Sequence, residues 1–579
     1  AYQTIELVGS AVIYLIGPSK NEHRFVGICG RNAPEWVYTQ HACSNYGLVT
    51  VPLYDTLGNE AMEHIIKQTE LEIIVCDTAT RARSLLKCSG KSLNQIVVWQ
   101  NDSDLIQLRL EKCDVPIISF DELLEIGRNH LISKADVRPE ELCLICYTSG
   151  TTGLPKGVLY THMQFMNCII KCRESLGDTL NEKLLDTHLS YLPLSHVMEQ
   201  FVMNTSLFYG SSIAFLTTNI TGLSKDLAYY RPSFFCAVPR IYSRIYSDTI
   251  KGCANRVSRW LLDYSIQQKL HEQKKGLYTR YGLLDYLFFR NIRKQMGDHV
   301  NIVISGSAPL QPEVLCFLKA AFSCPVLEGY GSTETGGIVC TSLIGDTTAG
   351  HVGALGVGVI VKLADVPDMG FVVERDRMGE ICVYSDGMTS GYYRDELRTK
   401  ELFDDDGFIR TGDVGMWTES GALKIVDRCK NMFKLAQGEY VAPERVENVY
   451  LTSPLINFIF VEGNSLHPFT VGVVVPSWTA LRERLLQQSD TNIGWSKSNQ
   501  LTEGELCTDE RVNNLLLTEL QAVGKRGGLK GFEQVRAIHI VAEPFTVDNG
   551  LLTPTMKLSR CAVRRQYAQV VADLYASNN

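Results

Sequence analysis

The chain has 579 residues, 45% of them hydrophobic and 21% charged, which describes an ordinary globular protein too long for a single hydrophobic core. Its net charge of −8 argues against a nucleic-acid-binding surface. Eighteen cysteines without the spacing of a disulfide framework are typical of a reduced, cytosol-facing compartment.

The first 140 residues alternate apolar strands with helices. Short apolar runs at Phe25–Cys29, Val49–Leu53 and Ile73–Cys76 predict strands, and Ala61–Thr69 predicts a helix between the last two. This alternation predicts an α/β domain with mainly parallel strands. The chain opens at Ala1 inside a helical pattern, so we expect a further segment to precede it in the complete protein.

A loop of small residues follows the apolar strand Leu142–Cys146. It reads Tyr-Thr-Ser-Gly-Thr-Thr-Gly-Leu-Pro-Lys-Gly over Tyr147–Gly157, and we predict a helix over Val158–Cys172 after it. Such a loop is typical of a phosphate site, because its N–H groups can converge on an anion and Lys156 adds positive charge. Gly157 rather than Ser or Thr follows the lysine, which excludes the NTPase P-loop. A solvated surface loop is the alternative.

Two features stand in the middle of the chain. Ser195 is a candidate cap for a helix, which would place His196 in the first turn, where the helix dipole disfavours the charged imidazole. A neutral histidine there can face a ligand or be satisfied by the local backbone, and the sequence leaves both open. Residues 241–300 are predicted to be helical and are rich in Arg and Lys. We interpret that charge as a solvated face, with attraction to anionic lipids as the alternative.

Two further strands, Ile302–Ile304 and one beginning at Pro325, lead into loops of small residues. In the second loop Gly329 and Gly331 allow the backbone to approach a planar ring or a phosphate. Glu334 offers a hard oxygen ligand suited to Mg²⁺, although an acidic turn without a ligand is the alternative. Three such loops at strand ends predict a nucleotide-binding crevice in an α/β sheet.

The pattern changes near residue 350, where strands become short and rich in turns, which predicts a β-rich subdomain. Asp413 follows a tight glycine turn and can accept hydrogen bonds from ribose hydroxyls. The charged break at Asp427–Lys430 marks a domain boundary. Lys557 follows a proline-containing turn far from the other motifs, and an isolated lysine of this kind is by default a surface residue.

Together these motifs resemble the adenylate-forming, acyl-CoA synthetase superfamily. Four phrases are similar to the eukaryotic long-chain fatty acid–CoA ligases: Val51–Gly58, Tyr191–His196, Glu328–Glu334 and Phe433–Tyr440. The resemblance extends from near Ala1 to about Ala568. It implies an α/β protein with an N-terminal adenylation domain over residues 1–427, including the β-rich part at 350–427, and a small mobile α/β C-terminal domain over 428–579.

The resemblance implies a two-step reaction: ATP and a fatty acid give an acyl-adenylate and pyrophosphate, and the thiol of coenzyme A then displaces AMP. Lys557 matches the adenylation lysine of the family, Thr151 and Glu334 match the residues that hold Mg²⁺, and Arg428–Lys430 matches the hinge. The residues implied to bind the nucleotide are Tyr147, Thr148, Ser149, Gly150, Thr151, Thr152, Gly153, Lys156, Gly306, Glu328, Gly329, Tyr330, Gly331, Thr333, Asp413, Arg428, Lys430 and Lys434.

Three alternatives stay open. The substrate can be a medium-chain acid, the acyl group can go to another acceptor such as a carrier protein, or the chain can be an inactive acyl- or nucleotide-binding protein. Intact Lys156, Glu334, Asp413 and Lys557 weigh against the last. We expect the protein to be cytoplasmic or to face the cytosol. If it is attached to a membrane, we expect peripheral attachment to the endoplasmic reticulum, the peroxisome or the outer mitochondrial membrane.

Overall fold

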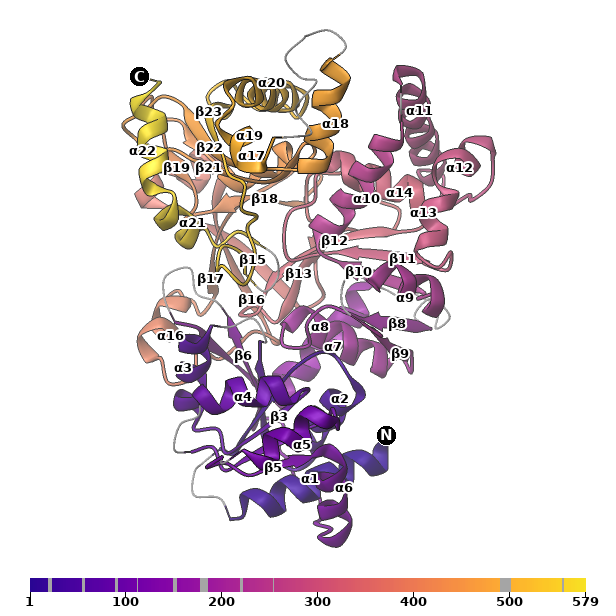
Figure 1. The fold of residues 1–579 in the computed structure, drawn as a ribbon, viewed down its shortest axis with the longest axis vertical. Coiled ribbons are helices and arrows are strands. Elements are labelled where there is room, and N and C mark those ends of the chain that lie inside the picture. Colours follow the sequence, from indigo (N-terminus) through magenta and orange to yellow (C-terminus); the bar gives the residue numbers. More distant parts are fainter. Residues whose placement is uncertain are drawn as a thin grey trace.

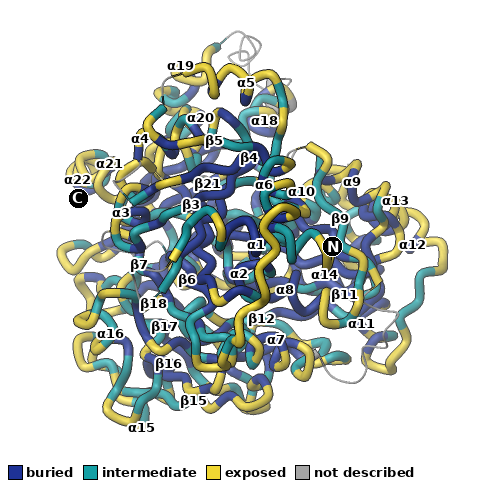
Figure 2. Tube along the Cα trace, turned by 90° about the horizontal axis from the view of Figure 1, so that it is seen from below, coloured by how far each residue is buried: buried dark blue, intermediate teal, exposed yellow. Residues whose placement is uncertain are grey.

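The computed structural model describes residues 1–18, 23–54, 58–88, 92–111, 113–148, 154–176, 186–218, 222–253, 255–489, 501–553 and 557–578. Figure 1 shows the N-terminal elements at the bottom, the middle of the chain on the right, and the C-terminal elements at the top left. In Figure 2 the strands run through the buried interior, and exposed segments lie around the rim and across the near face. The predicted α/β class is confirmed.

A seven-stranded sheet with the order β5-β4-β3-β1-β2-β6-β7 forms the N-terminal part. Its strands are β1 (Phe25–Cys29), β2 (Val49–Leu53), β3 (Ile73–Cys76), β4 (Gln95–Val98), β5 (Ile117–Ser119), β6 (Leu142–Thr148) and β7 (Lys156–Thr161). Its helices are α1 (Tyr2–Ile16), α2 (Pro34–Asn45), α3 (Asn59–Thr69), α4 (Ala79–Cys88), α5 (Ser103–Leu110) and α6 (Phe120–Asn129).

Both faces of this sheet are covered. Ile74 and Cys76 of β3 belong to the core formed with α3, α4 and α5, whereas Ile73 and Val75 belong to the core formed with α1, α2 and α6. Side chains alternate along a strand, so a strand buried on both faces is apolar throughout. All pairs from β5 to β6 are parallel, and only β7 is antiparallel to its neighbour.

The helix predicted over Val158–Cys172 was wrong in its first part. Residues 156–161 form β7, which pairs with β6 so that Lys156 lies opposite Thr148, and helix α7 begins only at His162. Tyr160 and Val158 are fully buried, as inward side chains of a strand are. The small-residue loop therefore connects two antiparallel strands rather than a strand and a helix.

A second sheet occupies the middle of the chain and has the order β10-β11-β12-β13-β14. Its strands are β10 (Phe234–Ala237), β11 (Ile302–Ser305), β12 (Val326–Ser332), β13 (Gly337–Thr341) and β14 (Ala354–Leu355), and a separate pair consists of β8 (Thr187–Ser190) and β9 (Ser212–Phe215). The helices here are α7 (His162–Leu176), α8 (Val197–Phe208), α9 (Leu223–Tyr230), α10 (Pro239–Gly252), α11 (Arg256–Gln273), α12 (Leu283–Phe288), α13 (Arg290–Gln295) and α14 (Pro312–Phe322).

The remaining elements form an antiparallel sheet and a C-terminal unit with its own core. The sheet contains β15 (Val359–Ala364), β16 (Met378–Ser385), β17 (Ile409–Trp417) and β18 (Leu423–Arg428), with the short helices η3 (Pro367–Met369), α15 (Val373–Asp376) and α16 (Glu396–Leu402). The C-terminal unit contains β19 (Phe433–Lys434), β20 (Tyr440–Val441), α17 (Pro443–Tyr450), β21 (Ile456–Glu462), β22 (Thr470–Pro476), α18 (Trp478–Ser489), α19 (Glu503–Thr508), α20 (Glu510–Arg526), β23 (Val535–Ile540), α21 (Arg560–Gln566) and α22 (Ala568–Ala576).

Candidate active site

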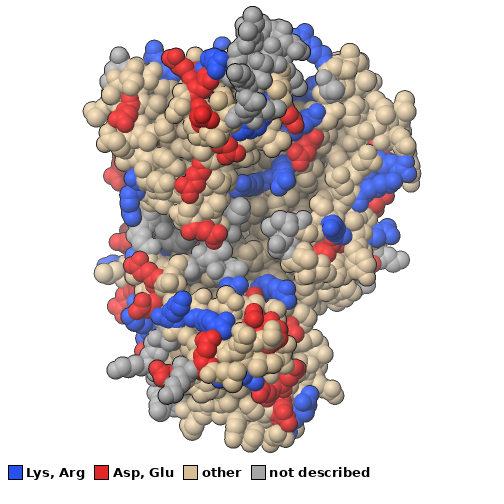
Figure 3. Space-filling model, viewed as in Figure 1, with Lys and Arg blue, Asp and Glu red and all other residues tan. Residues whose placement is uncertain are grey.

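A cleft of about 2200 Å³ lies where the second sheet, the four-stranded sheet and the C-terminal unit meet. Figure 3 shows a hollow near the middle of one face, with Lys and Arg side chains along its edge. The cleft is larger than the pocket of a typical drug-sized ligand, so it has room for a nucleotide together with a second substrate.

Most of the described residues that the sequence placed at a nucleotide site line this one cleft. They are Thr148, Lys156, Gly306, Glu328, Gly329, Tyr330, Gly331, Thr333, Glu334, Asp413, Arg428, Lys430 and Lys557. The residues Ser149, Gly150, Thr151, Thr152 and Gly153 lie outside the described residues. Segments separated by hundreds of positions in the chain are thus brought to one place.

Two predicted residues lie elsewhere. Tyr147 lies in β6 with its side chain buried in the core on one face of the first sheet, where its hydroxyl donates to Oε1 of Gln68 at 2.7 Å. Lys434 is exposed on β19, with its ammonium 5.4 Å from the ring centroid of Tyr440. Neither side chain lines the cleft in this arrangement of the chain.

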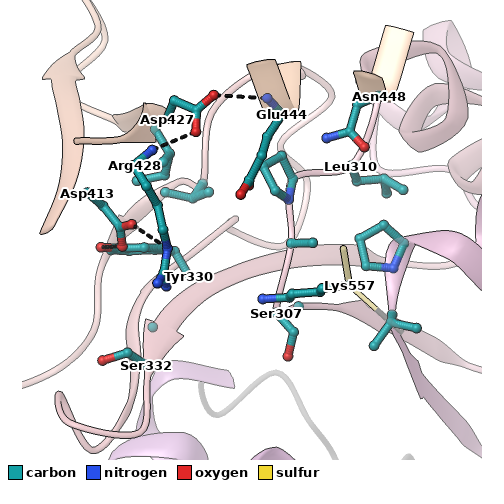
Figure 4. A pocket seen from close by; sticks show the side chains of 18 of the residues that line it. Ser307, Leu310, Tyr330, Ser332, Asp413, Asp427, Arg428, Glu444, Asn448 and Lys557 are labelled. Atoms are coloured by element: carbon teal, nitrogen blue, oxygen red, sulfur yellow. Dashed lines mark hydrogen bonds and ion pairs between the residues drawn. The ribbon is translucent and has the colours of Figure 1, made fainter. Parts of the chain in front are cut away.

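One end of the cleft holds a buried carboxylate between two donors. Asp413 and Arg428 face each other across β17 and β18, and Nε of Arg428 lies 3.1 Å from Oδ1 of Asp413. The Tyr330 hydroxyl donates to the other oxygen, Oδ2, at 2.8 Å (Figure 4). Burial raises the pKa of Asp413, and the Arg428 charge opposes that rise. Each carboxylate oxygen keeps further acceptor capacity, so Asp413 can still accept from a ligand hydroxyl.

Glu328 is a second buried carboxyl group at the cleft. Its Oε1 accepts the backbone N–H of Leu310 at 2.9 Å, and burial raises its pKa to about 7. The two neighbouring glycines, Gly329 and Gly331, differ in whether the structure leaves room for a side chain. A Cβ at Gly331 would lie 1.7 Å from the carbonyl oxygen of Gly337, whereas one at Gly329 would meet nothing closer than 3.8 Å. Strand pairing therefore requires Gly331, and both glycines lie in β12 rather than in the predicted loop.

Lys156 and Glu334 meet at Tyr392, a residue that the sequence did not single out. The Lys156 ammonium lies 4.7 Å from the centroid of the Tyr392 ring, and the Tyr392 hydroxyl donates to Oε1 of Glu334 at 2.9 Å. Burial lowers the pKa of Lys156, and the Glu334 carboxylate opposes the decrease. The sequence signal was weak, because Tyr392 reaches the site through an isolated bridge to Val158, far away along the chain.

His196 satisfies both interpretations that the sequence left open. It is the N-cap of α8 in place of Ser195, and its Nδ1 accepts the backbone N–H of Met198 at 3.1 Å. The ring also lines the cleft. Burial, followed by the Lys557 charge, lowers its pKa to about 4, so the imidazole is neutral at physiological pH with its proton on Nε2. Burial rather than the helix dipole is the main cause.

Lys557 lies in the cleft, which overturns its default assignment to the outer surface. Figure 4 shows its side chain beside Ser307, pointing into the same space as Arg428 and Tyr330. Its side chain is exposed at the cleft surface. Desolvation by the protein around the ammonium, together with the charge of Arg428, lowers its pKa, while Glu444 and Asp413 act in the opposite direction.

The segment carrying Lys557 is anchored to the C-terminal unit. The N–H of Thr553 donates to the carbonyl of Lys557 at 2.7 Å, and the N–H of Ser559 donates to the carbonyl of Leu551 at 2.9 Å. Arg560 follows directly, and its guanidinium lies 2.5 Å from Glu447 Oε1. Hydrogen bonds thus join Lys557 and Ser559 to the preceding backbone of the C-terminal unit.

Comparisons with known proteins identify the family of the chain. Residues 7–393 match the family of AMP-binding enzymes. The chain is 39% identical over 577 residues to the long-chain-fatty-acid–CoA ligase 5 of Mus musculus, covering 99% of this chain and 83% of that protein. It is 38% identical over 581 residues to the long-chain-fatty-acid–CoA ligase 1 of Homo sapiens, covering 99% and 81%.

A solved structure shows a similar fold. The adenylation domain of a carboxylate reductase from Mycobacterium chelonae has a TM-score of 0.79 and 26% identity, covering 99% of this chain and 83% of that chain. The chain therefore belongs to the AMP-binding enzyme family, in the branch of the long-chain-fatty-acid–CoA ligases.

Proposed function

We propose that this protein is a long-chain fatty acid–CoA ligase that forms an acyl-adenylate from ATP and the acid, then transfers the acyl group to coenzyme A. The observation that carries the proposal is the identity of 39% to such a ligase over 99% of the chain. The cleft supports it, because Lys557, Asp413, Arg428 and Glu334 all line one space.

In the first step a carboxylate oxygen attacks the α-phosphorus, and the bond to pyrophosphate breaks. Two anions must approach, so positive charge at the reacting oxygens lowers the barrier. Lys557 supplies that charge from the C-terminal unit, and Lys156 neutralises the departing pyrophosphate. Asp413 accepts hydrogen bonds from the ribose hydroxyls and fixes the nucleotide. In the second step the CoA sulfur attacks the acyl carbonyl carbon, and the bond to AMP breaks.

Mg²⁺ is part of the proposal, with Glu334 and Thr151 as its protein ligands. Among the described residues, no group of three or more His, Cys, Asp and Glu side chains is placed to hold a metal ion. One cleft carboxylate fits Mg²⁺, which takes one or two carboxylates together with substrate phosphate oxygens and water. When bound, the ion neutralises charge on the phosphates.

We further propose that residues 428–579 rotate as a unit about Arg428–Lys430 between the two steps. The C-terminal unit has its own hydrophobic core, which supports movement as one body. Withdrawal of Lys557 after adenylation would open the cleft to the CoA thiol, so that one site serves both reactions.

We also infer a cytosol-facing location with peripheral membrane attachment. Long-chain acids partition into bilayers, so a ligase at the bilayer surface meets its substrate there. In the part of the chain that the structure describes, no helix is both long and apolar enough to cross a membrane.

A series of saturated acids tests the chain-length assignment. With ATP, Mg²⁺ and CoA, kcat/KM is expected to rise by on the order of tenfold or more from octanoate to palmitate, because each added methylene that is buried contributes about 0.8 kcal/mol. The measurement is AMP release with the acyl-CoA product identified by mass spectrometry. A maximum at octanoate would contradict the long-chain assignment and favour the medium-chain alternative.

A further inference from the structure

Helices α11 and α12 and the turn between them expose an unusual number of large apolar side chains. The α11–α12 face consists of Val257, Trp260, Tyr264, Leu277, Tyr281, Leu283, Tyr286 and Leu287. Tyr281 is 89% exposed, Leu283 75% and Trp260 63%, which is the reverse of their usual burial. Figures 1 and 2 both place α12 at the outer edge of the molecule.

The outward side of α11 carries two exposed aromatic side chains among its polar residues. Leu262, Ile266 and Leu270 point into the core beside α14. Trp260 and Tyr264, spaced by one helical turn, lie on the opposite side, and their rings stack with centroids 5.8 Å apart. The outward side of α11 thus carries a pair of exposed aromatic rings beside polar residues such as Asp263 and Gln267. Exposed apolar side chains gathered on a surface mark an interaction site.

The same segment is strongly basic. Nine Lys and Arg residues but only three Asp and Glu residues lie between Arg256 and Lys294, in a chain whose net charge is −8. Some charges of both signs are paired locally: Asp285 is buried between Lys269 and Arg293, and Asp263 lies 3.5 Å from Arg259. Lys274, Lys275, Arg290 and Lys294 are exposed. Figure 3 shows basic side chains along this edge.

We propose that the α11–α12 face docks onto the surface of an anionic phospholipid bilayer. Trp and Tyr are the side chains that prefer the headgroup level of a membrane, and flanking Lys and Arg are attracted to anionic lipids. The Arg290 guanidinium lies 4.8 Å from the Tyr286 ring, so an aromatic and a basic side chain stand together at this point. A protein partner fits less well, because lysine is depleted in protein–protein interfaces.

Docking here would bring the substrate cleft close to the bilayer. Helix α10 directly precedes α11, and Arg240, Ser243 and Lys251 of α10 line the cleft. The inference rests on the proposed peripheral attachment but not on ligase activity. Vesicle binding is measured without substrates, so it can fail while the ligase assay succeeds. Likewise, vesicle binding can be observed while the ligase assay fails.

The test is co-flotation of the purified chain with vesicles of phosphatidylcholine alone or mixed with phosphatidylserine. Wild type is expected to float with the mixed vesicles. The variant Trp260→Ala/Tyr281→Ala/Leu283→Ala is expected to bind them on the order of tenfold or more weakly, because less apolar area enters the interface. Lys274→Glu/Lys275→Glu should weaken binding on the order of fivefold per lysine and reduce its dependence on salt.

A matched control replaces Leu397 and Leu466, which are 81% and 80% exposed on other elements, with alanine. This variant should float like wild type. All the changed side chains are exposed, and circular dichroism with palmitate-dependent AMP release in detergent checks that each variant is folded. Three outcomes would overturn the proposal: wild type stays unbound, the triple variant floats unchanged, or light scattering shows a wild-type dimer that the triple variant abolishes. The last would assign the face to a second copy of the chain.

Discussion

Lys557→Ala is expected to lower the fatty-acid-dependent exchange of pyrophosphate into ATP by on the order of a thousandfold. The side chain is a cation that the C-terminal unit contributes to the cleft, and its charge interacts with Asp413 and Arg428. Its charge is needed where the substrate carboxylate meets the α-phosphate. Exchange of labelled pyrophosphate measures this step directly, because it requires adenylation and its reversal but no CoA.

The same variant should still convert supplied acyl-adenylate and CoA into acyl-CoA, since the charge is needed only in the first step. Lys525→Ala, an exposed lysine on α20, is the matched control and should exchange at the wild-type rate. Because desolvation by the surrounding protein lowers the pKa of Lys557, kcat/KM for exchange should fall with rising pH below the range of an ordinary lysine. Unchanged exchange in the alanine variant would refute the role given to Lys557.

Arg560→Ala is expected to destabilise the C-terminal unit by about 3–5 kcal/mol, because it leaves the Glu447 carboxylate buried and without its cationic partner. Arg560 is 7% and Glu447 4% exposed, and their closest atoms lie 2.5 Å apart. The guanidinium also donates to the carbonyl of Val461 at 2.7 Å. Denaturant unfolding followed by circular dichroism measures the change in the free energy of unfolding.

Arg564→Ala is the matched control for this prediction. Arg564 also pairs with a carboxylate, Glu462, at 2.7 Å, but its side chain is 48% exposed, so its loss should cost about 1 kcal/mol or less. Replacing both Arg560 and Glu447 with apolar residues of similar volume should recover much of the lost stability. Equal destabilisation by the two single arginine variants would contradict the account of Arg560 as a buried anchor.

The parallel strands of the first sheet could be predicted from the sequence, and β7 could not. Phe25–Cys29, Val49–Leu53 and Ile73–Cys76 are buried on both faces, so continuous apolar runs marked their limits. Strand β7 begins at a lysine and a glycine and continues directly into α7. These residues form a strand because they pair with β6, and the hydrophobic periodicity of the local sequence does not reveal that pairing.

The residues of the candidate site could be predicted where they belong to short motifs that are recognisable in the local sequence. Asp413, Glu328 and Glu334 stand in short turn- and glycine-rich phrases, and all line the cleft. Tyr392 was missed because it joins Lys156 to Glu334 only through the folded chain. Gly331 was predicted for a ligand reason, whereas contact with the Gly337 backbone already requires it. Lys557 was predicted as a site residue only from the family resemblance, because its local sequence favoured a position on the outer surface.

We expect one cleft, completed by Lys557, to perform adenylation and then thioester formation on a long-chain acid. Mass spectrometry of the products from palmitate, ATP and Mg²⁺ in a single turnover, before and after CoA is added, tests this directly. Palmitoyl-adenylate and pyrophosphate should form first, followed by palmitoyl-CoA and AMP. Palmitoyl-adenylate that persists after CoA is added would contradict the claim and favour transfer to another acceptor, and the absence of any adenylate or thioester would indicate an inactive binding protein.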